Sequence, residues 1–208
     1  MPLATVRTVR EVGSQMIAIE LESPPEFDAD PGQFVKVEAT KDGDTESGYY
    51  TLSSPTIDET FEITAKYDSS GTVGPWLAER EAGDEISFTG PYGDIRYTGG
   101  HDVVVVASGP GIGPAVGIAE RALDTGAEAT VIYHEASAYS DRLEQLDERG
   151  ARIHYVSEYH EIVDQFQSAD SSATYVFGFA EFISSAKDAL AAAGIDSEVV
   201  HIENFGPE

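Results

Sequence analysis

Residues 103–114 read VVVVASGPGIGP, an apolar run that leads directly into a turn rich in glycine and proline. Val103–Ala107 is typical of a buried strand in a parallel sheet, and Pro114 stands at a favoured position in the first turn of a helix. Glycines let the backbone approach a pyrophosphate closely, and a helix N-terminus favours an anion. The pattern Gly109-x-Gly111-x-x-Pro114 therefore indicates a nucleotide-binding turn; a turn without a ligand is the alternative.

The second half of the chain alternates between apolar strands and helical stretches, which is the pattern of βαβ units. An alanine-rich stretch, residues 180–193, ends at Gly194, as helices often do. We expect a doubly wound parallel sheet of the Rossmann type in a domain of residues 99–208, with the boundary near Gly99-Gly100. Its predicted strands are Val103–Ala107, Thr130–Tyr133, Arg152–Val156, Thr174–Phe177 and Val199–Ile202.

The first half has a shorter rhythm, with β-rich segments separated by turn residues such as Lys41-Asp42-Gly43-Asp44. Six short strands at this spacing predict a small antiparallel barrel over residues 1–98, interrupted by a short helix at Pro75–Arg80. The predicted strands are Thr5–Arg10, Met16–Leu21, Phe34–Glu38, Tyr49–Ser53, Phe61–Tyr67 and Glu85–Thr89.

The charge balance is extreme, because 38 acidic residues face 12 basic ones and the formal net charge is -26. Such repulsion is screened at molar salt, where the Debye length is about 3 Å, so we expect a salt-adapted, halophilic protein. An ordinary acidic protein with acidic tails is the alternative, but the acids are scattered through periodic segments. The shortage of clustered lysine and arginine argues against nucleic acid as a partner.

The chain has no cysteine, which excludes disulfides, thiolate zinc sites and cysteine-ligated iron–sulfur clusters within it. The five histidines show no metal-ligand spacing, so no metal site is predicted. The N-terminus lacks the apolar run of a signal peptide, and glycines and prolines break the most apolar stretch. We therefore expect a soluble, cytoplasmic protein that does not insert into membranes and whose redox work would need an organic cofactor.

Four segments, taken in order, resemble the ferredoxin–NADP reductase superfamily. Pro31-Gly32-Gln33-Phe34 resembles the turn before a barrel strand, and Gly90-Pro91-Tyr92-Gly93 the segment that closes the flavin domain. The turn at Gly109–Pro114 resembles the nicotinamide-nucleotide turn, and Glu203-Asn204-Phe205 the C-terminal strand end that approaches the flavin. The resemblance implies a flavin-binding barrel followed by a domain that binds NAD(P)H.

The stretch Gly48-Tyr49-Tyr50-Thr51-Leu52-Ser53-Ser54-Pro55 supplies a fifth match. The resemblance implies that the Tyr50 ring lies against the isoalloxazine and that the Thr51 hydroxyl lies near flavin N5. An aromatic face can stack on a flavin and a hydroxyl can donate or accept there. The alternative is a strand with core aromatics. The resemblance also places Glu203 near the flavin, so Tyr50, Thr51 and Glu203 are the predicted catalytic residues.

The chain departs from the family pattern at three places. Gly48 stands where an arginine usually holds the flavin phosphates, and Gly74 replaces the hydroxyl residue of the pyrophosphate turn that begins at Gly71. Phe177-Gly178-Phe179 replaces Cys-Gly-Pro beside the nicotinamide, either contacting that ring or serving as core. These two losses at the phosphate end indicate weaker flavin retention, a different geometry of the flavin phosphates, or FMN in place of FAD. We favour FAD.

Nucleotide choice is predicted from the end of the second α/β strand. NADPH users present an arginine there to the 2′-phosphate, whereas this chain has Ala136 preceded by Glu135, which could accept a ribose hydroxyl and would repel a phosphate. NADH is therefore favoured over NADPH. The predicted cofactor-binding residues are Tyr49, Tyr50, Thr51, Leu52, Ser53, Gly71, Thr72, Val73, Gly74, Gly109, Pro110, Gly111, Ile112, Gly113, Pro114, Glu135, Phe177, Gly178, Phe179 and Phe205.

Together these features predict a flavin-dependent oxidoreductase that passes hydride from NAD(P)H to bound FAD and electrons to an external acceptor. Because the chain has no cysteine for an iron–sulfur centre, the acceptor is expected outside it: ferredoxin, flavodoxin, an oxygenase component or a small oxidant. We expect a stand-alone reductase. The alternative is a non-catalytic or regulatory flavin- and nucleotide-binding subunit of a larger redox complex, whose lost contacts mark a decayed site.

Overall fold

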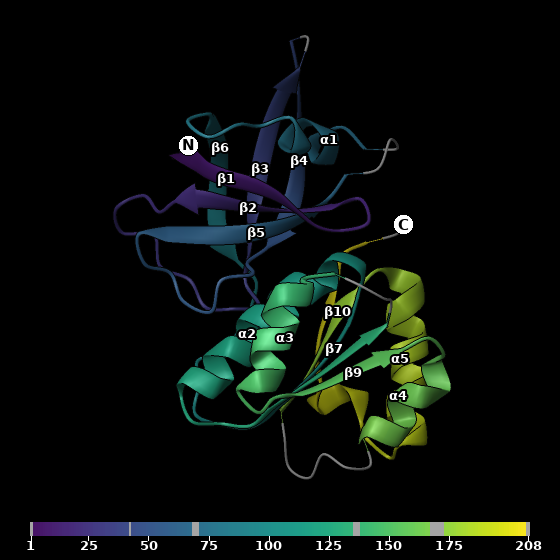
Figure 1. The fold of residues 1–208 in the computed structure, drawn as a ribbon. Helices are drawn as coiled ribbons and strands as arrows, with labels where there is room; N and C mark the ends of the chain where they lie inside the picture. The colour runs from purple at the N-terminus through teal and green to yellow at the C-terminus, as the bar shows by residue number, and fades with distance from the viewer. Residues whose placement is uncertain (1, 42, 68–70, 135–137, 167–172, 207–208) are drawn as a thin grey trace.

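Two sheets organise the chain in the computed structural model, which describes residues 2–41, 43–67, 71–134, 138–166 and 173–206 (Figure 1). The first sheet is antiparallel, with the strand order β4-β3-β6-β1-β2-β5. Its strands are β1 (Leu3–Gly13), β2 (Met16–Glu22), β3 (Phe34–Lys41), β4 (Asp44–Thr51), β5 (Thr60–Lys66) and β6 (Glu85–Tyr92), and the short helix α1 (Val73–Ala78) lies between β5 and β6.

The outer strands of this sheet meet just beyond β4. Leu52 forms a bridge with Ile63 of β5, and the Ser53 N–H donates to the Glu62 carbonyl at 2.8 Å. Alternate residues of β5, Phe61, Ile63 and Ala65, are fully buried, as expected for a strand with one face toward a core. The predicted antiparallel barrel is confirmed as this curled six-stranded sheet.

Strand β4 differs from its predicted bounds at both ends. It begins at Asp44, five residues before the predicted start at Tyr49, and stops at Thr51 instead of Ser53. Residues 44–48 are polar and mostly exposed, so they carry no apolar alternation. Pairing with β3 along its whole length makes them a strand.

The second sheet is entirely parallel, in the order β11-β10-β7-β8-β9. Figure 1 shows α2 and α3 on one face of this sheet and α4 and α5 on the other, which confirms the predicted doubly wound parallel sheet. The strands are β7 (Val103–Ser108), β8 (Ala129–His134), β9 (Arg152–Val156), β10 (Ala173–Gly178) and β11 (His201–Asn204), and the helices are α2 (Ile112–Asp124), α3 (Ser140–Glu148), α4 (Tyr159–Phe166) and α5 (Ala180–Ala192).

The last strand begins at His201, two residues after its predicted start at Val199. Ser197–Val199 instead forms a 3-10 turn, η2, because the Asp196 side chain accepts the backbone N–H of Glu198 at 3.0 Å. The local cap therefore outweighs the apolar pattern of residues 199–202.

Strand order reverses between β7 and β10, and this position determines where a ligand fits. In a doubly wound sheet the connections leave to opposite sides at such a point and open a crevice beyond the strand ends. The glycine-containing 3-10 turn η1 (Gly109–Gly111) follows β7, and Phe179 follows β10. Figure 1 shows this end of the parallel sheet beneath the barrel.

The segment between the two sheets, residues 93–102, is anchored by Tyr97. Its side chain is fully buried, its N–H donates to the Pro31 carbonyl at 2.9 Å, and its hydroxyl donates to the His101 carbonyl at 2.7 Å. The ring also meets Tyr175 of β10 edge-on, with centroids 6.2 Å apart. The predicted boundary near Gly99-Gly100 falls within this segment, where we propose to divide the domains.

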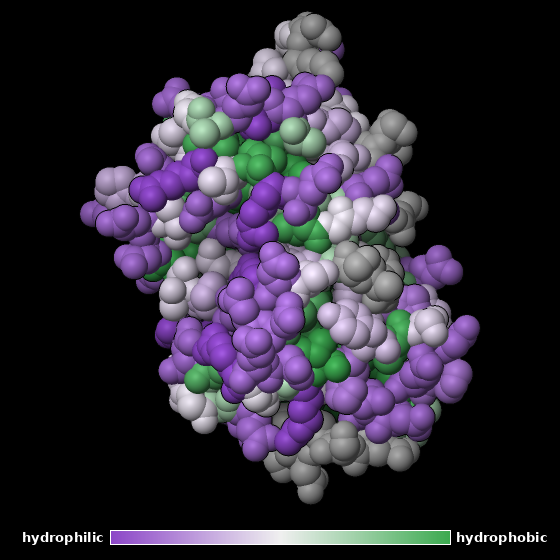
Figure 2. Space-filling view, in the orientation of Figure 1, coloured by the Kyte–Doolittle hydropathy of each residue, from purple (hydrophilic) through white to green (hydrophobic). Residues whose placement is uncertain are grey.

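Hydrophilic side chains cover most of the face shown in Figure 2, across both domains. Within the described residues, no helix combines the length and the apolar character needed to cross a membrane.

Candidate functional site

A cleft of about 400 Å³ lies where the barrel faces the switch point of the parallel sheet. Strands β4 and β5 and the turn into α1 form its barrel side, whereas single residues from the loops after β7, β10 and β11 form the opposite side. Its lining residues are Glu46, Ser47, Gly48, Tyr49, Tyr50, Thr51, Thr64, Lys66, Gly71, Thr72, Val73, Gly74, Pro75, Pro110, Phe179 and Phe205.

Tyr50 forms the aromatic part of the barrel wall, and Gly48 makes room for it. A Cβ atom at Gly48 would lie 2.7 Å from the Tyr50 hydroxyl oxygen and 2.8 Å from a ring carbon, so the ring lies across the glycine. Burial raises the pKa of the Tyr50 phenol, which keeps it neutral. Thr51 lines the same cleft and is 7% exposed. With Gly48 in place of the arginine of the family pattern, the cleft lacks that positive charge, and the Tyr50 ring occupies the space beside the glycine.

The turn that leads into α1 approaches β5 so closely that Gly74 cannot carry a side chain. A Cβ atom there would lie 2.2 Å from the Lys66 carbonyl oxygen. At Gly71, by contrast, nothing lies within 4 Å of the position of a Cβ atom. The second departure from the family pattern thus has a local cause, because a hydroxyl residue at position 74 would push α1 away from the strand.

Two phenylalanines form the opposite wall. The rings of Phe179 and Phe205 meet edge-on with centroids 5.9 Å apart, and the Lys66 Nζ atom lies 5.5 Å from the Phe179 ring centroid. The Phe205 N–H donates to the Gly178 carbonyl at 2.9 Å, which fixes the C-terminal segment to the end of β10. Phe179 thus lines the cleft beyond β10, whereas Phe177 is a core residue with no exposed surface.

A second cleft, of about 220 Å³, continues from the first over the turn after β7. Lys66 and Phe179 line both clefts, and Ser108, Gly109 and His134 line the second. The His134 ring stacks on Tyr159 at a centroid distance of 4.6 Å and an interplanar angle of 9°. Together the two clefts run from the barrel to the carboxyl ends of β7 and β8.

Each glycine of the turn has its own steric reason. Gly109 has a φ of +54°, in the left-handed region that favours glycine. A Cβ atom at Gly111 would lie 2.4 Å from the Phe177 carbonyl oxygen, so this glycine lets the turn touch the end of β10. These are the tight-turn and close-approach roles that a nucleotide-binding turn assigns to its glycines.

Several predicted cofactor-binding residues are buried or closely packed, and their contact with a cofactor stays a prediction. Leu52, Ile112 and Phe177 are fully buried core residues. The Ser53 hydroxyl donates to Glu62 at 2.7 Å, and a Cβ atom at Gly113 would lie 2.2 Å from the Thr64 hydroxyl, so both lie where the domains meet. Pro114 is buried in α2, and a Cβ atom at Gly178 would lie 2.6 Å from the Phe182 ring.

Glu203 is the predicted catalytic residue that the structure keeps out of the cleft. It pairs in register with Phe177 on the outer strand β11 and does not belong to the lining of either cleft within the described part of the chain. Burial raises the pKa of its carboxyl group. Glu135, the residue on which the nucleotide preference rests, lies outside the described residues.

Thr64 and Lys66 line the cleft although sequence reasoning did not select them. Both lie on β5, two residues apart, and alternate residues of a strand share a face. Recognising the β5–α1 connection as cleft lining would have identified them, because period 2 along β5 then places both on that face.

The groups around the cleft fit a flavin. Tyr50, Phe179 and Phe205 offer flat apolar faces, and Thr51 and Thr64 offer hydroxyls that can contact polar ring atoms. Lys66 brings a positive charge, and the turn at residues 71–74 brings backbone N–H groups that suit phosphate oxygens. This set of donors and aromatic surfaces is what an isoalloxazine with a phosphate tail requires.

Comparison with known proteins agrees with this geometry. Residues 4–97 match the model of the oxidoreductase FAD-binding domain. The chain is 22% identical to the flavohem-like FAD/NAD-binding domain of nitric oxide dioxygenase from Vibrio cholerae, and the superposition covers 99% of this chain and 98% of the other with a TM-score of 0.78. The chain therefore shares its two-domain fold with that FAD/NAD-binding domain.

Curated relatives match over most of the chain. The ferredoxin reductase component of 3-ketosteroid-9-alpha-monooxygenase from Mycobacterium tuberculosis is 28% identical, over 84% of this chain and 54% of the relative. The glycine betaine monooxygenase reductase subunit of Pseudomonas aeruginosa is also 28% identical, over 85% and 56%. This chain spans about half the length of these relatives. Residues 4–97 thus match the oxidoreductase FAD-binding domain family, and the chain as a whole is similar to reductase components of two monooxygenases.

Proposed function

We propose that this chain is an NAD(P)H-dependent flavin reductase that passes electrons to an acceptor outside itself. The observation that carries the proposal is the shared cleft, in which Tyr50 and Thr51 of the barrel face Phe179 and Phe205 of the α/β domain. A flavin on the barrel side and a nicotinamide on the other would meet there. Both domains contribute walls, so the cleft suits two cofactors in contact.

The bound FAD would accept hydride from the reduced nicotinamide and release electrons singly or in pairs. The protein's task is then to hold the reacting atoms at about 3–3.5 Å and to exclude water. Tyr50 would cover the ring as a neutral phenol, and Thr51 would hold a hydrogen bond at its polar edge. Because Glu203 lies outside the cleft, we assign the direct contacts to Tyr50 and Thr51.

The nucleotide would lie along the second cleft, with its phosphates on the backbone N–H groups of the turn Ser108–Gly111. Backbone donors suit a strongly acidic protein, since they attract phosphate without basic side chains. We propose NADH as the preferred donor, because Ala136 replaces the arginine that recognises a 2′-phosphate and Glu135 would repel one. FAD is proposed as the flavin, in line with the FAD-binding model matched by the barrel.

The acceptor is proposed to be a separate redox protein or a small oxidant. With no cysteine, these 208 residues hold no iron–sulfur centre with cysteine ligands. The relatives described above are reductase components of monooxygenases, which supports an oxygenase component or a ferredoxin as the acceptor. A flavodoxin and a small oxidant are the other classes consistent with a flavin donor.

A second candidate function is a nucleotide-binding subunit without reductase activity. The glycines at positions 48 and 74 favour it, because each stands where the family pattern described above has a residue expected to hold the flavin phosphates. Such a subunit would keep the two clefts but would not catalyse reduction of the flavin by NAD(P)H.

Anaerobic spectroscopy separates the two functions. The purified chain is loaded with FAD and mixed with NADH in an oxygen-free cuvette, and the visible absorption band of the oxidised flavin is followed. If the protein is a reductase, NADH bleaches the bound flavin. We also expect a lower Michaelis constant for NADH than for NADPH. A protein that stays yellow with both nucleotides, or that binds no flavin, contradicts the proposal. Identification of the flavin that the protein carries on purification, before any FAD is added, decides between FAD and FMN.

A further inference from the structure

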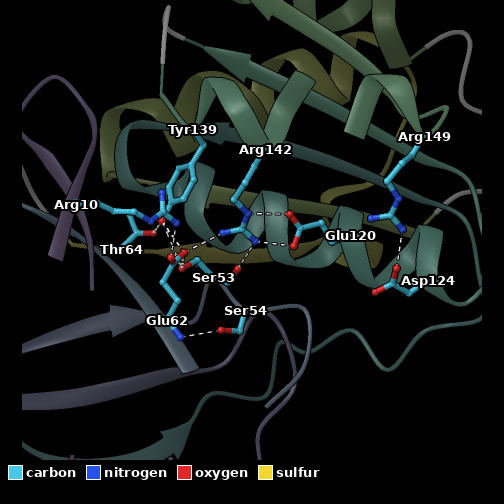
Figure 3. Close-up of polar contacts among 10 residues, drawn as sticks. All are labelled: Arg10, Ser53, Ser54, Glu62, Thr64, Glu120, Asp124, Tyr139, Arg142 and Arg149. Atoms are coloured by element: carbon cyan, nitrogen blue, oxygen red, sulfur yellow. Dashed lines mark hydrogen bonds and ion pairs between the residues drawn. The ribbon is translucent and has the colours of Figure 1, made fainter. Parts of the chain in front are cut away.

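Arg142 of α3 lies between two carboxylates where the α/β domain meets the barrel (Figure 3). Its Nε and Nη2 atoms donate to the two carboxylate oxygens of Glu120 of α2 at 2.8 and 2.7 Å. Its Nη1 atom donates to Glu62 of β5 at 2.9 Å, and Nη2 also donates to the Ser53 carbonyl at 2.6 Å. We call Glu62, Glu120 and Arg142 the interdomain clamp.

The clamp is shielded from solvent, unlike an ordinary surface ion pair. Its three side chains are only 13–17% exposed. Burial alone would lower the pKa of Arg142, but hydrogen bonding and charge from Glu120 and the charge of Glu62 raise it, so the guanidinium stays charged. Salt screens such a group much less than an exposed pair. Removal of Arg142 would leave the Glu120 carboxylate without its counter-charge, whereas Glu62 would keep Arg10, whose Nη2 atom also donates to it.

Tyr139 adds a second link beside the clamp. Its hydroxyl lies 2.6 Å from the Thr64 hydroxyl and donates to Glu62 at 3.1 Å, while its backbone N–H donates to the Val12 carbonyl at 2.6 Å. Thr64 lines the first cleft. Tyr139, the residue before α3, is therefore held to both β1 and β5, and its partner Thr64 reaches the proposed flavin site.

Helix α2 lies directly against the barrel. A Cβ atom at Gly117 would lie 2.9 Å from the Ser53 carbonyl oxygen, and one at Gly113 would lie 2.2 Å from the Thr64 hydroxyl. The same helix follows the nucleotide-binding turn without a break. Ser53 stands two residues after Thr51. The contact thus joins the segment that would hold the nucleotide to the segment that would hold the flavin.

Building on the reductase function proposed above, we propose that Glu62, Glu120 and Arg142 are positioning residues that fix the distance between the flavin and nicotinamide sides of the cleft. They contact neither cleft directly and act through Ser53 and α2. Hydride transfer tolerates little misplacement, and an error of about 1 Å can reduce the rate by about 100-fold. By fixing how the two domains dock, the interdomain clamp would limit misplacement of the nicotinamide relative to the flavin.

Distance measurement tests the clamp independently of any cofactor. Because the chain has no cysteine, spin labels can be attached at Leu3→Cys and Val199→Cys, two residues that are 53% and 72% exposed, one in each domain. Double electron–electron resonance should give one narrow distance in this background and a broadened or shifted one after Arg142→Met. The matched control is Arg149→Met, since Arg149 also joins α3 to α2, at 2.6 Å from Asp124, but at the surface and within one domain.

The triple variant Glu62→Gln, Glu120→Gln and Arg142→Met is a second test in case Arg142→Met does not fold. It removes the ion pairs of the clamp without leaving a buried unpaired charge. We expect it to broaden the distance as well. An unchanged distance in both clamp variants overturns the proposal. This readout needs neither flavin nor NADH, so it decides the clamp even if the parent protein does not reduce FAD.

Rapid kinetics then tests the positioning role in the FAD-loaded protein. We expect Arg142→Met, or the triple variant, to lower the limiting rate of flavin reduction by NADH by about 10- to 100-fold. The dissociation constant for FAD should stay within about twofold of that of the parent, since the flavin contacts lie on the barrel. A limiting rate equal to that of Arg149→Met, or a loss confined to FAD affinity, overturns the proposal.

Discussion

At the scale of single residues, Gly48 and Tyr50 determine how much of a flavin site the barrel retains. The Tyr50 ring lies across Gly48, so a side chain can be introduced at position 48 only if the ring moves. The atoms in contact are the outer end of a rotatable side chain. An arginine side chain can therefore be accommodated at position 48 if the Tyr50 ring rotates away.

Gly48→Arg should tighten FAD binding by about fivefold. A charge-assisted hydrogen bond contributes roughly 1.5–3 kcal/mol, and moving the Tyr50 ring offsets part of it. Fluorescence titration with FAD measures the change, and riboflavin, which has no phosphate, is the control ligand. Tightening of both ligands alike, or of neither, contradicts a phosphate contact.

Glu203 gives a pH dependence whose sign follows from its burial. Its pKa is raised in the folded protein, so the folded state binds this proton more readily than the unfolded chain. The charged carboxyl therefore weakens stability at neutral pH, and the penalty is relieved as pH falls through the folded pKa. Glu203→Gln should be more stable than the parent at pH 7, with the difference shrinking toward mildly acidic pH.

Urea denaturation at a series of pH values measures this difference. The exposed Glu198→Gln is the control and should show no such convergence. A difference between Glu203→Gln and the parent that stays constant with pH would show that the carboxyl does not take up a proton in this range.

The glycine turn and the Tyr50-Thr51 pair could be predicted from sequence because each has a local signature. The clamp could not, since Glu62 and Glu120 stand 80 and 22 positions from Arg142 and are two among 38 acidic residues. Only the docking of the two domains brings them together. The displacement of Glu203 from the cleft has the same origin, because sequence shows which strand carries a residue but not which side chains reach the cleft.

At the scale of elements, α1 depends on a contact that permits no side chain. The backbone at Gly74 lies against the Lys66 carbonyl, and only three residues farther back Gly71 faces open space. The turn thus contains one glycine, Gly74, whose position excludes a side chain, and one, Gly71, whose position has room for one. Substitutions at the two positions can be compared directly.

Gly74→Ser should lower the free energy of unfolding by about 1–3 kcal/mol and weaken FAD binding, because α1 must move away from β5. Gly71→Ser should change stability by no more than about 0.5 kcal/mol. Urea denaturation and FAD titration of both variants check this. Equal effects at the two positions would contradict the contact at Gly74.

The order and type of the elements could be predicted where apolar residues repeat with a clear period, as in β5, or form an unbroken apolar run, as in β7. Bounds failed where local chemistry or pairing replaced that period. The polar start of β4 is a strand because β3 pairs with it, and the apolar start predicted for β11 is a turn because Asp196 caps it.

At the scale of the whole molecule, the charge of -26 is the dominant property. Exposed acids repel one another over about 30 Å at 10 mM salt but over only about 3 Å at 1 M. The buried clamp is much less screened, so added salt should relieve the repulsion while leaving the domain junction intact.

The unfolding midpoint should therefore rise by about 5–10 °C between 10 mM and 1 M KCl, which corresponds to a gain of a few kcal/mol for a chain of this size. Thermal denaturation followed by circular dichroism measures it. An unfolding midpoint that does not change with KCl would contradict salt adaptation.

The clamp also constrains how the sequence can change over generations. Loss of Arg142 alone leaves the buried Glu120 carboxylate without its counter-charge, and loss of either carboxylate removes one of the two ion pairs of Arg142. Positions 62, 120 and 142 should therefore be inherited as a set, kept together or replaced together. Homologues that have exchanged all three would mark a lineage in which the two domains dock at a different angle.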